Sequence, residues 1–396
     1  MKFRTLYAAL AVSRTGSATR ASTDAGATQP AITAAITQVE AELGLPLFTR
    51  TARGMSVTAA GEVFCARVDG AFGHLDMAEA ALRRRRGGGP MPNLRRVVTE
   101  RQLRALSALL EAGSFMAAAR ALGVTQPNIH RLVRDLETLA GVALWRQEGA
   151  IGEATADGRL LARAGDLCRR EIGLAVDAAR EQQGHVDGSL LIGALPLSRT
   201  QWVPRAMVEL LRQFPQAQVR LVDGPYAEQL RALRHGRIDL IVGALRDPAP
   251  VEDVEQIPTF DDALTIAVRP GHPLLSATVR GVADLPPDLT WVLPAQGAPG
   301  RTVFERHLQQ SGCPAPKRVI ECGSLVATRA LLLGSDFAAP LSMRQIQIEL
   351  EKGLLAVLCG PLPGTSRPIG LTLRRGFQPT LLYRQFMDLL ISGREI

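Results

Sequence analysis

One stretch of this sequence occurs twice and decides the fold of the N-terminal half. Residues 28–62 read TQPAITAAITQVEAELGLPLFTRTARGMSVTAAGE, and residues 125–159 read TQPNIHRLVRDLETLAGVALWRQEGAIGEATADGR. The two stretches align without a gap at an offset of 97 residues, and the match extends upstream to Leu6 and Leu103. Because chance does not readily give so many matches in one register, the sequence predicts a tandem duplication of one small module.

Local chemistry predicts the layout of this module. In the second copy, leucines at helical spacing indicate a first helix, and Ser114 is suited to cap a second one. Gly123 permits a sharp turn, after which Thr125 is suited to cap a third helix with Pro127 in its first turn. The first copy continues into a short basic hairpin at residues 50–57. Helices joined by a tight glycine turn and followed by a hairpin predict a winged helix-turn-helix.

The first copy closely resembles the N-terminal DNA-binding module of LysR-type regulators. The family pattern is a Ser/Thr-Gln-Pro helix start, then Leu-Glu-x-x-Leu-Gly, Leu-Phe-x-Arg and a Thr-x-x-Gly after the wing. This sequence has TQP, VEAELG, LFTR and TAAG in that order. The second copy resembles the family from about Glu100 to Leu161, with an eroded wing, so the chain departs from the common plan of one module. The resemblance implies double-stranded DNA as a partner.

An α-helix fits the major groove of DNA, and side chains near its N-terminus reach the base edges. A glutamine amide at that end, here Gln29 or Gln126, can pair with adenine. The alternative for each is an ordinary solvent-facing polar residue beside a helix cap. The predicted DNA-binding residues of the two copies are Thr28, Gln29, Pro30, Thr33, Arg50, Arg53, Thr125, Gln126, Pro127, His130, Arg131 and Arg134.

The two copies differ in where they carry positive charge. The third helix of the first copy is nearly free of basic side chains, whereas its wing has two arginines. The second copy has basic side chains on the helix, and Gln147 and Ala150 at the wing positions. Phosphate attraction supplies most non-specific affinity. Two hypotheses follow: the second copy reads the groove while the first clamps the backbone, or one copy no longer contacts DNA and only stabilises a dimer.

Two further segments are predicted to connect the modules to the rest of the chain. Arg83–Arg86, followed by Gly87–Gly89 and Pro90, indicates the end of one module and a flexible linker. This arginine run is either a solvated face or a phosphate contact. Residues 158–183 have the pattern of a long amphipathic helix, matched by 61–82 in the first copy. In LysR-type proteins the corresponding helix pairs two subunits, so the resemblance implies a homodimer or homotetramer.

From Gly188 onwards, short apolar strands alternate with amphipathic helices. This alternation predicts βαβ units and a parallel sheet with helices on both faces. A second set of such units begins near residue 263, and a strand around PIGLTLRR with a helix at Leu381–Ile391 is expected to return to the first set. Two lobes joined by crossing strands resemble the periplasmic-binding-protein-like effector domain of LysR-type regulators, and RIDLIVGA and RPGHPL are family-like segments.

The predicted fold is therefore multidomain: two α-helical winged helix-turn-helix modules and an α/β two-lobed effector domain. The predicted boundaries are 1–62 for the first module, 63–98 for its helix and the Gly/Arg-rich linker, 99–158 for the second module, 159–186 for the linker or dimerisation helix, and 187–396 for the effector domain. Within the effector domain, the first lobe is expected at about 187–262 and 350–396, and the second at about 263–349.

Ligands of open α/β sheets bind beyond the carboxyl ends of the strands and against helix N-termini. Arg199 would suit a carboxylate or another anion, although neighbouring hydroxyls are also consistent with helix capping alone. The segment IGALPLSRT resembles a LysR branch linked to sugar or aromatic-compound metabolism, so we expect an anionic or sugar-derived effector. The predicted effector-binding residues are Ser198, Arg199, Thr200, Gln296, Gly297 and Ser324.

Composition narrows the function further. The net charge is +8, and residues 1–100 hold 13 Lys and Arg against 8 Asp and Glu, which is where a polyanionic partner is expected. Five scattered cysteines without a CxxC motif indicate reduced thiols rather than zinc or disulfides. The apolar run Leu6–Val12 is too short to span a membrane. We therefore expect a cytoplasmic, nucleoid-associated protein with no membrane partner, cofactor or metal.

The sequence also bears on competing functions. A nucleophile elbow, a Walker loop or an HExxH motif would favour an enzyme, and the sequence contains none of them, so no catalytic residue is predicted. A DNA-binding architectural protein with a degenerate sensor is a further alternative. The prediction is a sequence-specific DNA-binding transcriptional regulator that responds to a small molecule bound between two lobes.

Overall fold

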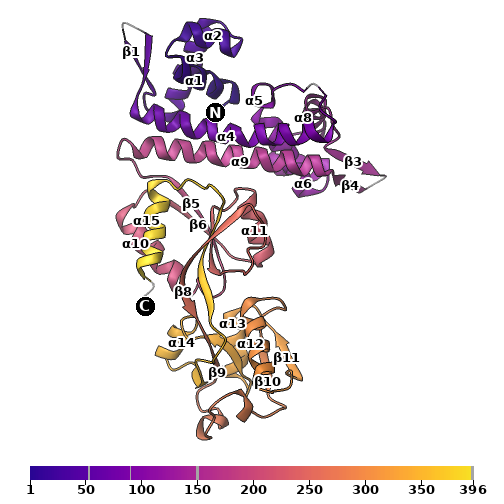
Figure 1. The fold of residues 1–396 in the computed structure, drawn as a ribbon, viewed down its shortest axis with the longest axis vertical. Helices are drawn as coiled ribbons and strands as arrows, with labels where there is room; N and C mark the ends of the chain where they lie inside the picture. The colour runs from indigo at the N-terminus through magenta and orange to yellow at the C-terminus, as the bar shows by residue number, and fades with distance from the viewer. Residues whose placement is uncertain (52–53, 90, 149–150, 394–396) are drawn as a thin grey trace.

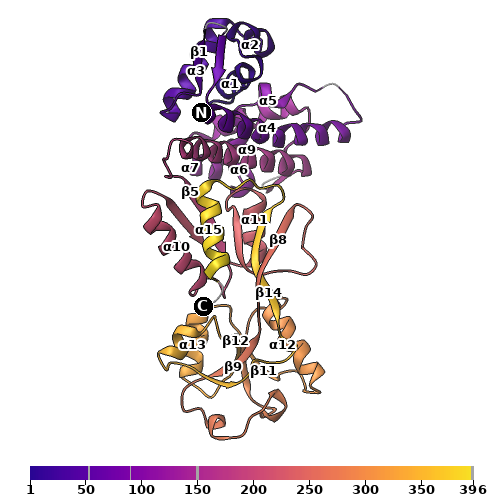
Figure 2. The ribbon, with the colours of Figure 1, turned by 60° about the vertical axis from the view of Figure 1, so that its left-hand side comes forward.

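The computed structural model describes residues 1–51, 54–89, 91–148 and 151–393, arranged in three tiers along the long axis (Figures 1 and 2). A helical tier contains both copies of the repeat. One α/β lobe lies against this tier, and a second lobe lies at the far end of the molecule. The two winged modules and the two-lobed domain predicted from the sequence are thus all present.

Each copy of the repeat folds into three helices and a two-stranded hairpin. Glycines in the left-handed region end the helices of both copies, as at Gly26 and Gly123, where φ is +57° and +66°. The apolar run near the N-terminus lies in the first helix, where Leu6 is fully buried. The elements are α1 (Phe3–Thr15), α2 (Ala18–Ala25), α3 (Gln29–Leu43), β1 (Phe48–Thr51) and β2 (Gly54–Val57), then α6 (Glu100–Ala112), α7 (Phe115–Leu122), α8 (Gln126–Ala140), β3 (Trp145–Glu148) and β4 (Ile151–Ala154).

The two modules repeat one another down to individual contacts. The carboxylate of Glu40 accepts two backbone N–H bonds at the start of the first hairpin, at 2.8 and 3.0 Å. Glu137 does the same in the second module, at 2.9 and 3.2 Å. A Cβ atom at Gly61 or Gly158 would lie 2.1 or 2.0 Å from the carbonyl oxygen that precedes each hairpin. The repeat therefore preserves backbone geometry that only glycine permits.

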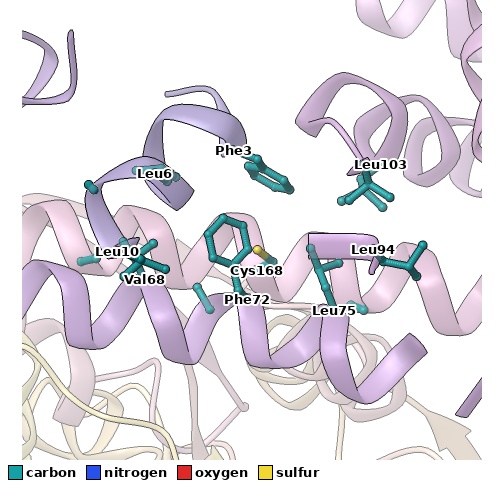
Figure 3. Packing of buried hydrophobic residues seen from close by; sticks show 14 of the residues in the cluster. Phe3, Leu6, Leu10, Val68, Phe72, Leu75, Leu94, Leu103 and Cys168 are labelled. Carbon is teal, nitrogen blue, oxygen red and sulfur yellow. The ribbon is translucent and has the colours of Figure 1, made fainter. Parts of the chain in front are cut away.

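The two longest helices, α4 (Ala59–Arg85) and α9 (Ala156–Glu181), run side by side in opposite directions (Figure 1). The end of α4 meets the start of α9, where Arg85 and Asp157 form an ion pair at 2.5 Å. Phe72 and Leu75 of α4 and Cys168 of α9 are buried in the same cluster (Figure 3). The sequence prediction gave such a helix a partner in another subunit, whereas here the partner of α9 is α4 of the same chain.

The segment that joins the modules is held against α4. A short helix, α5 (Leu94–Val97), places the Leu94 side chain in the core, and the Leu94 N–H donates to Glu79 Oε2 at 2.8 Å. Arg95 forms ion pairs with Asp69 at 2.5 Å and Asp76 at 2.9 Å on α4. The flexible linker predicted from Gly87–Gly89 and Pro90 stays a prediction, and the segment that follows it is held against α4 by these contacts.

The first lobe is a five-stranded sheet in the order β6-β5-β7-β14-β8, flanked by helices. The strands β5, β6 and β7 are parallel, as predicted, but β14 runs antiparallel to both of its neighbours, so the sheet is mixed. The predicted return of the C-terminal strand and helix is confirmed. The elements are β5 (Ser189–Ala194), α10 (Trp202–Gln213), β6 (Gln218–Val222), α11 (Tyr226–Arg234), β7 (Leu240–Ala244), β8 (Val254–Asp262), β14 (Arg367–Arg374) and α15 (Leu381–Ser392).

The second lobe contains the remaining strands, and its boundary differs from the expected one. Strand β13 pairs with β9, so the chain stays in the second lobe beyond residue 350 and returns with β14. The elements are β9 (Leu264–Val268), η1 (Pro273–Ser276), η2 (Val282–Asp284), β10 (Thr290–Leu293), α12 (Pro299–Gln310), β11 (Arg318–Glu321), α13 (Leu325–Leu333), β12 (Ala339–Ser342), α14 (Gln347–Glu351) and β13 (Ala356–Cys359).

A buried charge network fixes the first lobe to the helical tier. Asp239 is fully buried and accepts from Arg170 of α9 at 2.7 Å and from Arg374 of β14 at 2.8 Å. The Tyr383 hydroxyl also donates to Asp239, and burial raises the pKa of this tyrosine well above its usual value. A second contact reaches the second module directly, where Arg237 pairs with Glu111 of α6. The first lobe is thus attached to α9 and to one of the two modules.

Candidate functional site

In the first module, the predicted reading helix α3 presents a neutral polar face. Thr28 caps the helix by accepting from the Ala31 N–H at 3.4 Å, and Gln29 and Pro30 are exposed in the first turn. The opposite face is buried in the module core, and it includes Ile32. The solvent-facing side chains form one shallow surface composed of Gln29, Pro30, Thr33, Ala34, Thr37, Gln38 and Ala41.

In the second module, the corresponding face of α8 is basic. The side chains of Gln126, His130, Arg131 and Arg134 are all exposed. Arg131 donates to Asn128 Oδ1 at 3.3 Å, which holds its guanidinium beside the helix start. The prediction for the start of this helix needs one correction: Thr125 occupies the capping position, followed by Pro127, but its side chain makes no capping hydrogen bond.

The wings differ from what the sequences of the two copies predict. Arg50 lies on β1 and is exposed, whereas Arg53 lies outside the described residues, as do the side chain of Gln147 and residue 150. Arg146 on β3 is exposed and gives the second wing a positive charge that sequence reasoning missed. The sequence itself shows this arginine, one position before Gln147. The second wing is therefore less depleted of positive charge than predicted.

The predicted effector residues have different roles in the structure. Arg199 spans the two lobes, donating to Asp223 at 3.2 Å and to the Gly323 carbonyl at 3.3 Å. Ser198 is fully buried, and its hydroxyl is bonded to backbone carbonyls, one of them Val242 O at 2.6 Å. The Thr200 hydroxyl bonds to Leu197 O. Neither hydroxyl caps α10, so the capping alternative is wrong for both.

The second lobe contributes the other three predicted residues. Ser324 caps α13 by accepting from the Ala327 N–H at 3.4 Å, so its hydroxyl has a structural role. Gln296 and Gly297 are exposed in the loop between β10 and α12, and Gly297 adopts a φ of +78°. The structure therefore brings Arg199 close to the Gly323–Ser324 corner.

A cavity of about 260 Å³ lies between the lobes on α10, next to the predicted Ser198–Thr200 loop. Its lining includes Gln201, Trp202 and Arg205 from the first lobe. Gln201 is 8% exposed, and its amide nitrogen and oxygen are buried with no hydrogen-bond partner among the described residues. A buried amide without partners is costly, which makes this side chain suited to bind a polar ligand. The effector-binding residues predicted in this loop end at Thr200, one position before Gln201.

Aromatic and charged side chains line the rest of the cavity, and they include the carboxylate of Glu209. Trp202 and Phe260 pack edge to face with ring centroids 4.9 Å apart. The Arg344 guanidinium, from the second lobe, lies 4.5 Å from the Phe260 ring centroid. Aromatic rings with a nearby guanidinium suit a ligand that has both an apolar part and a negative charge. The motif-based search missed Phe260 and Arg344 because neither lies at a helix start.

A buried ion pair lies where the connecting strands cross between the lobes. Asp262, at the end of β8, pairs with Arg367, at the start of β14, at 3.0 Å. Ser342 of β12 donates to Asp262 at 2.5 Å. Burial raises the pKa of Asp262, while the charge of Arg367 opposes that rise. This arrangement ties the hinge strands to the second lobe beside the cavity.

The described residues contain no group of three or more metal-ligating side chains. Across the same part of the chain, none of the helices combines the length and apolar character that crossing a bilayer would demand.

Family models match nearly the whole chain. The model described as LysR substrate binding domain matches residues 183–394. The model described as bacterial regulatory helix-turn-helix protein, lysR family, matches twice, at residues 3–62 and 100–159. The second match begins 97 residues after the first, which is the offset of the internal repeat.

Two relatives show how far the similarity extends. The HTH-type transcriptional regulator GalR of Pseudomonas putida is 31% identical over 367 residues, covering 92% of this chain and 90% of that protein. Because the uncovered 8% is shorter than one module, this alignment reaches into both copies of the repeat. The HTH-type transcriptional regulator PcaQ of Agrobacterium fabrum is 31% identical over 268 residues, covering 68% of this chain and 86% of that protein.

Solved structures share the fold. The crystal structure of CbnR, a LysR family transcriptional regulator, gives a TM-score of 0.53 at 24% identity and covers 74% of this chain and 98% of that chain. Full-length OxyR from Pseudomonas aeruginosa gives a TM-score of 0.53 at 18% identity, covering 75% and 94% respectively.

Proposed function

The chain belongs to the LysR family of DNA-binding transcriptional regulators with an effector-binding domain, and from this premise we propose which of its surfaces bind DNA and effector. The DNA surface consists of the exposed starts of α3 and α8 and the two wings. The effector site is the cavity between the lobes. The regulatory role needs no catalytic step, and a regulator of transcription works beside the nucleoid in the cytoplasm.

The exposed helix starts carry the DNA proposal. In both modules, a glutamine follows the threonine at the N-cap position and is exposed in the first helical turn, which is the part of a reading helix that meets base edges. Arg131 and Arg134 on α8, Arg50 on β1 and Arg146 on β3 supply positive charge for phosphates.

Charge reversal tests this surface. We expect R131E/R134E to weaken binding of the full chain to duplex DNA at least 10-fold near 0.1 M salt, and to reduce the slope of log affinity against log salt by about 0.9 for each phosphate that is no longer neutralised. R212E on α10, an exposed site remote from the modules, serves as the control. Unchanged affinity and slope in R131E/R134E would remove α8 from the interface.

The buried, unpartnered amide of Gln201 carries the effector proposal. A small organic anion with a ring, such as an aromatic or sugar acid, would place its polar groups on Gln201 and Arg205 and its ring against Trp202. Arg199, which contacts Asp223 in the first lobe and the Gly323 carbonyl in the second, would hold the two lobes together near the site. Of the predicted residues, Gln296 and Gly297 remain candidates for the mouth of the site, while Ser198, Thr200 and Ser324 shape it.

Thermal unfolding of the full chain with a panel of small aromatic and sugar acids tests this site. A ligand at 100 times its Kd stabilises the folded state by about 2.7 kcal/mol, which raises the Tm measurably. The Q201L variant should lose the shift caused by any compound that stabilises the wild type. Retention of the full shift in Q201L would place the effector elsewhere.

The oligomeric state predicted from the sequence, a homodimer or homotetramer, is also part of the proposal. The α4 and α9 helices already cover each other within one chain. We therefore assign any contact between subunits to the effector domain rather than to these helices.

A further inference from the structure

The surface that joins the two modules is complete within one chain. Residues facing the helix partner on α4, such as Val68 and Phe72, are fully buried. On α9, Cys168 and Ala175 are fully buried as well. A second chain could reach this surface only by displacing a helix that is covalently present at high effective concentration.

The pairing also merges the two modules into one body. A single cluster of buried apolar side chains begins at Phe3 in the first module, crosses α4 and Leu94, and continues through Leu106 of the second module to Ala179 of α9. Module positions are therefore fixed by packing. Two modules on a loose tether could rotate freely, but two modules sharing a core present their reading helices in one fixed relation.

The fixed relation places the reading helices at opposite ends of the α4–α9 pair (Figure 1). Each module packs on the helix that follows it: Phe3 of α1 meets Phe72 of α4 with ring centroids 5.4 Å apart, and α6 lies on α9. Because α4 and α9 are antiparallel, one module lies at each end. Such a two-headed arrangement matches two sites spaced along one duplex.

We call the first module with α3 and the second module with α8 the two heads. They present different side chains to the DNA. The α3 face offers threonine hydroxyls and neutral amides, such as Thr33 and Gln29, whereas the equivalent α8 face offers His130, Arg131 and Arg134. Arginine pairs best with guanine, while glutamine pairs with adenine and hydroxyls contact either base type. The two heads share the glutamine in the first turn but differ further along the helix, so they are suited to different base sequences.

We infer that one chain recognises one asymmetric DNA site composed of two different half-sites, with α3 on one half and α8 on the other. This inference rests on the proposed DNA surface. It replaces the symmetric reading of a palindrome by two identical subunits with reading by the two unlike halves of a single polypeptide.

The site is first identified by selection from a random duplex library with the purified full chain. We expect an enriched motif without two-fold symmetry. With duplex in excess, native mass spectrometry should show one bound duplex for each chain, whatever the number of chains in the oligomer. A palindromic motif occupied by two chains would overturn the inference while leaving the DNA-binding proposal standing. Failure of every duplex to bind at low salt would instead overturn the proposed DNA surface itself.

A matched pair of variants then shows which head reads which half of the motif. Gln29 and Gln126 are repeat equivalents, both exposed at the starts of their helices. Against a panel of single-base changes, Q29A should flatten base preference, from about 10-fold or more to under 2-fold, in one half of the motif only. Q126A should do so in the other half only. If either variant changed both halves alike, one module would be reading both, and the inference would be wrong.

Folding is controlled within the same experiment. Both glutamines are exposed, so Q29A and Q126A should keep the Tm of the wild type. The double variant R131A/R134A provides a second route to the same answer, because it should abolish discrimination in the half read by α8 and leave the preference of the α3 half intact.

Discussion

Gly158 shows that the second module needs a residue without a Cβ atom at one position. A Cβ atom there would lie 2.0 Å from the carbonyl oxygen of Leu144, which belongs to backbone and cannot move aside. We expect G158A to destabilise the chain by at least about 1–3 kcal/mol, as overpacking does, measured by chemical unfolding. Gly70, on α4, has open space around its Cβ position, so G70A should be neutral or stabilising by up to about 1 kcal/mol. Equal effects of the two substitutions would contradict this account.

Asp239 supports a second prediction at the scale of the residue. It is fully buried between the guanidinium groups of Arg170 and Arg374. Removal of its charge would leave Arg170 without its carboxylate partner and Arg374 with only Glu171, at 3.4 Å. We expect D239A to lose about 3–5 kcal/mol of unfolding free energy in urea titrations. The exposed pair Arg212–Glu209 offers the contrast, since R212A should cost less than about 1 kcal/mol. A much smaller loss in D239A, similar to that in R212A, would show that the network contributes little.

At the scale of elements, the proposed reading helices α3 and α8 were predictable from the sequence because their signals are local. The Thr-Gln-Pro triplet, the spacing of apolar residues and the terminal glycine all fall within one helix, and α8 begins at Gln126 as that pattern indicates. The pairing of α4 with α9 was not predictable in the same way. Periodicity shows that a helix has an apolar face, but it does not identify which helix will cover that face.

The proposed effector site also contains a part that the sequence predicts and a part that it does not. The sequence located the cleft through the loop after β5, and Arg199 does span the two lobes there. Sequence reasoning missed Gln201, Phe260 and Arg344, because they come together only through the packing of the two lobes. Strand β13 was missed for a related reason. Its four residues are mostly half-buried, and it is their pairing with β9 that makes them a strand.

Arg67 of α4 donates to the carbonyl oxygens of Gln378 and Pro379 in the first lobe, and His74 on the same helix predicts a pH dependence. Burial, together with the positive charges of Arg374 and Arg163, lowers the pKa of His74 from 6.5 to about 4. The unfolded chain therefore binds a proton at this site at a higher pH than the folded chain does. The stabilisation is present above pH 6.5 and is lost as the pH falls from 6.5 toward 4, by roughly 3 kcal/mol.

The measurement is the unfolding free energy of wild type and H74Q between about pH 7 and pH 4. Other carboxylates titrate in the same range, so the difference between the two proteins isolates the histidine. We expect the wild type to lose more stability than H74Q over this interval. Parallel curves would show that His74 titrates normally in the folded state.

At the scale of the whole molecule, the shared core predicts that the two modules unfold together. Phe72 is fully buried in the cluster that runs through both modules, and F72A should cost about 3–5 kcal/mol. In hydrogen exchange, this substitution should lower the protection of α6 and α8 as well as that of α1 and α3. Phe304, fully buried in a separate cluster of the second lobe, provides the control, because F304A should lower protection in that lobe alone. Loss of protection confined to the first module in F72A would show that the modules fold independently.

The antiparallel pairing of α4 with α9 inside one polypeptide has a consequence for how DNA specificity evolves. When two identical subunits share a duplex, each codon change appears on both sides at once, and a new base preference must suit both sides together. Here the two heads are encoded by separate stretches of one gene, so a codon change alters one side only. Mutation can then retune one half of the target while the other half still anchors the protein, which lets such a regulator acquire new promoters in single steps.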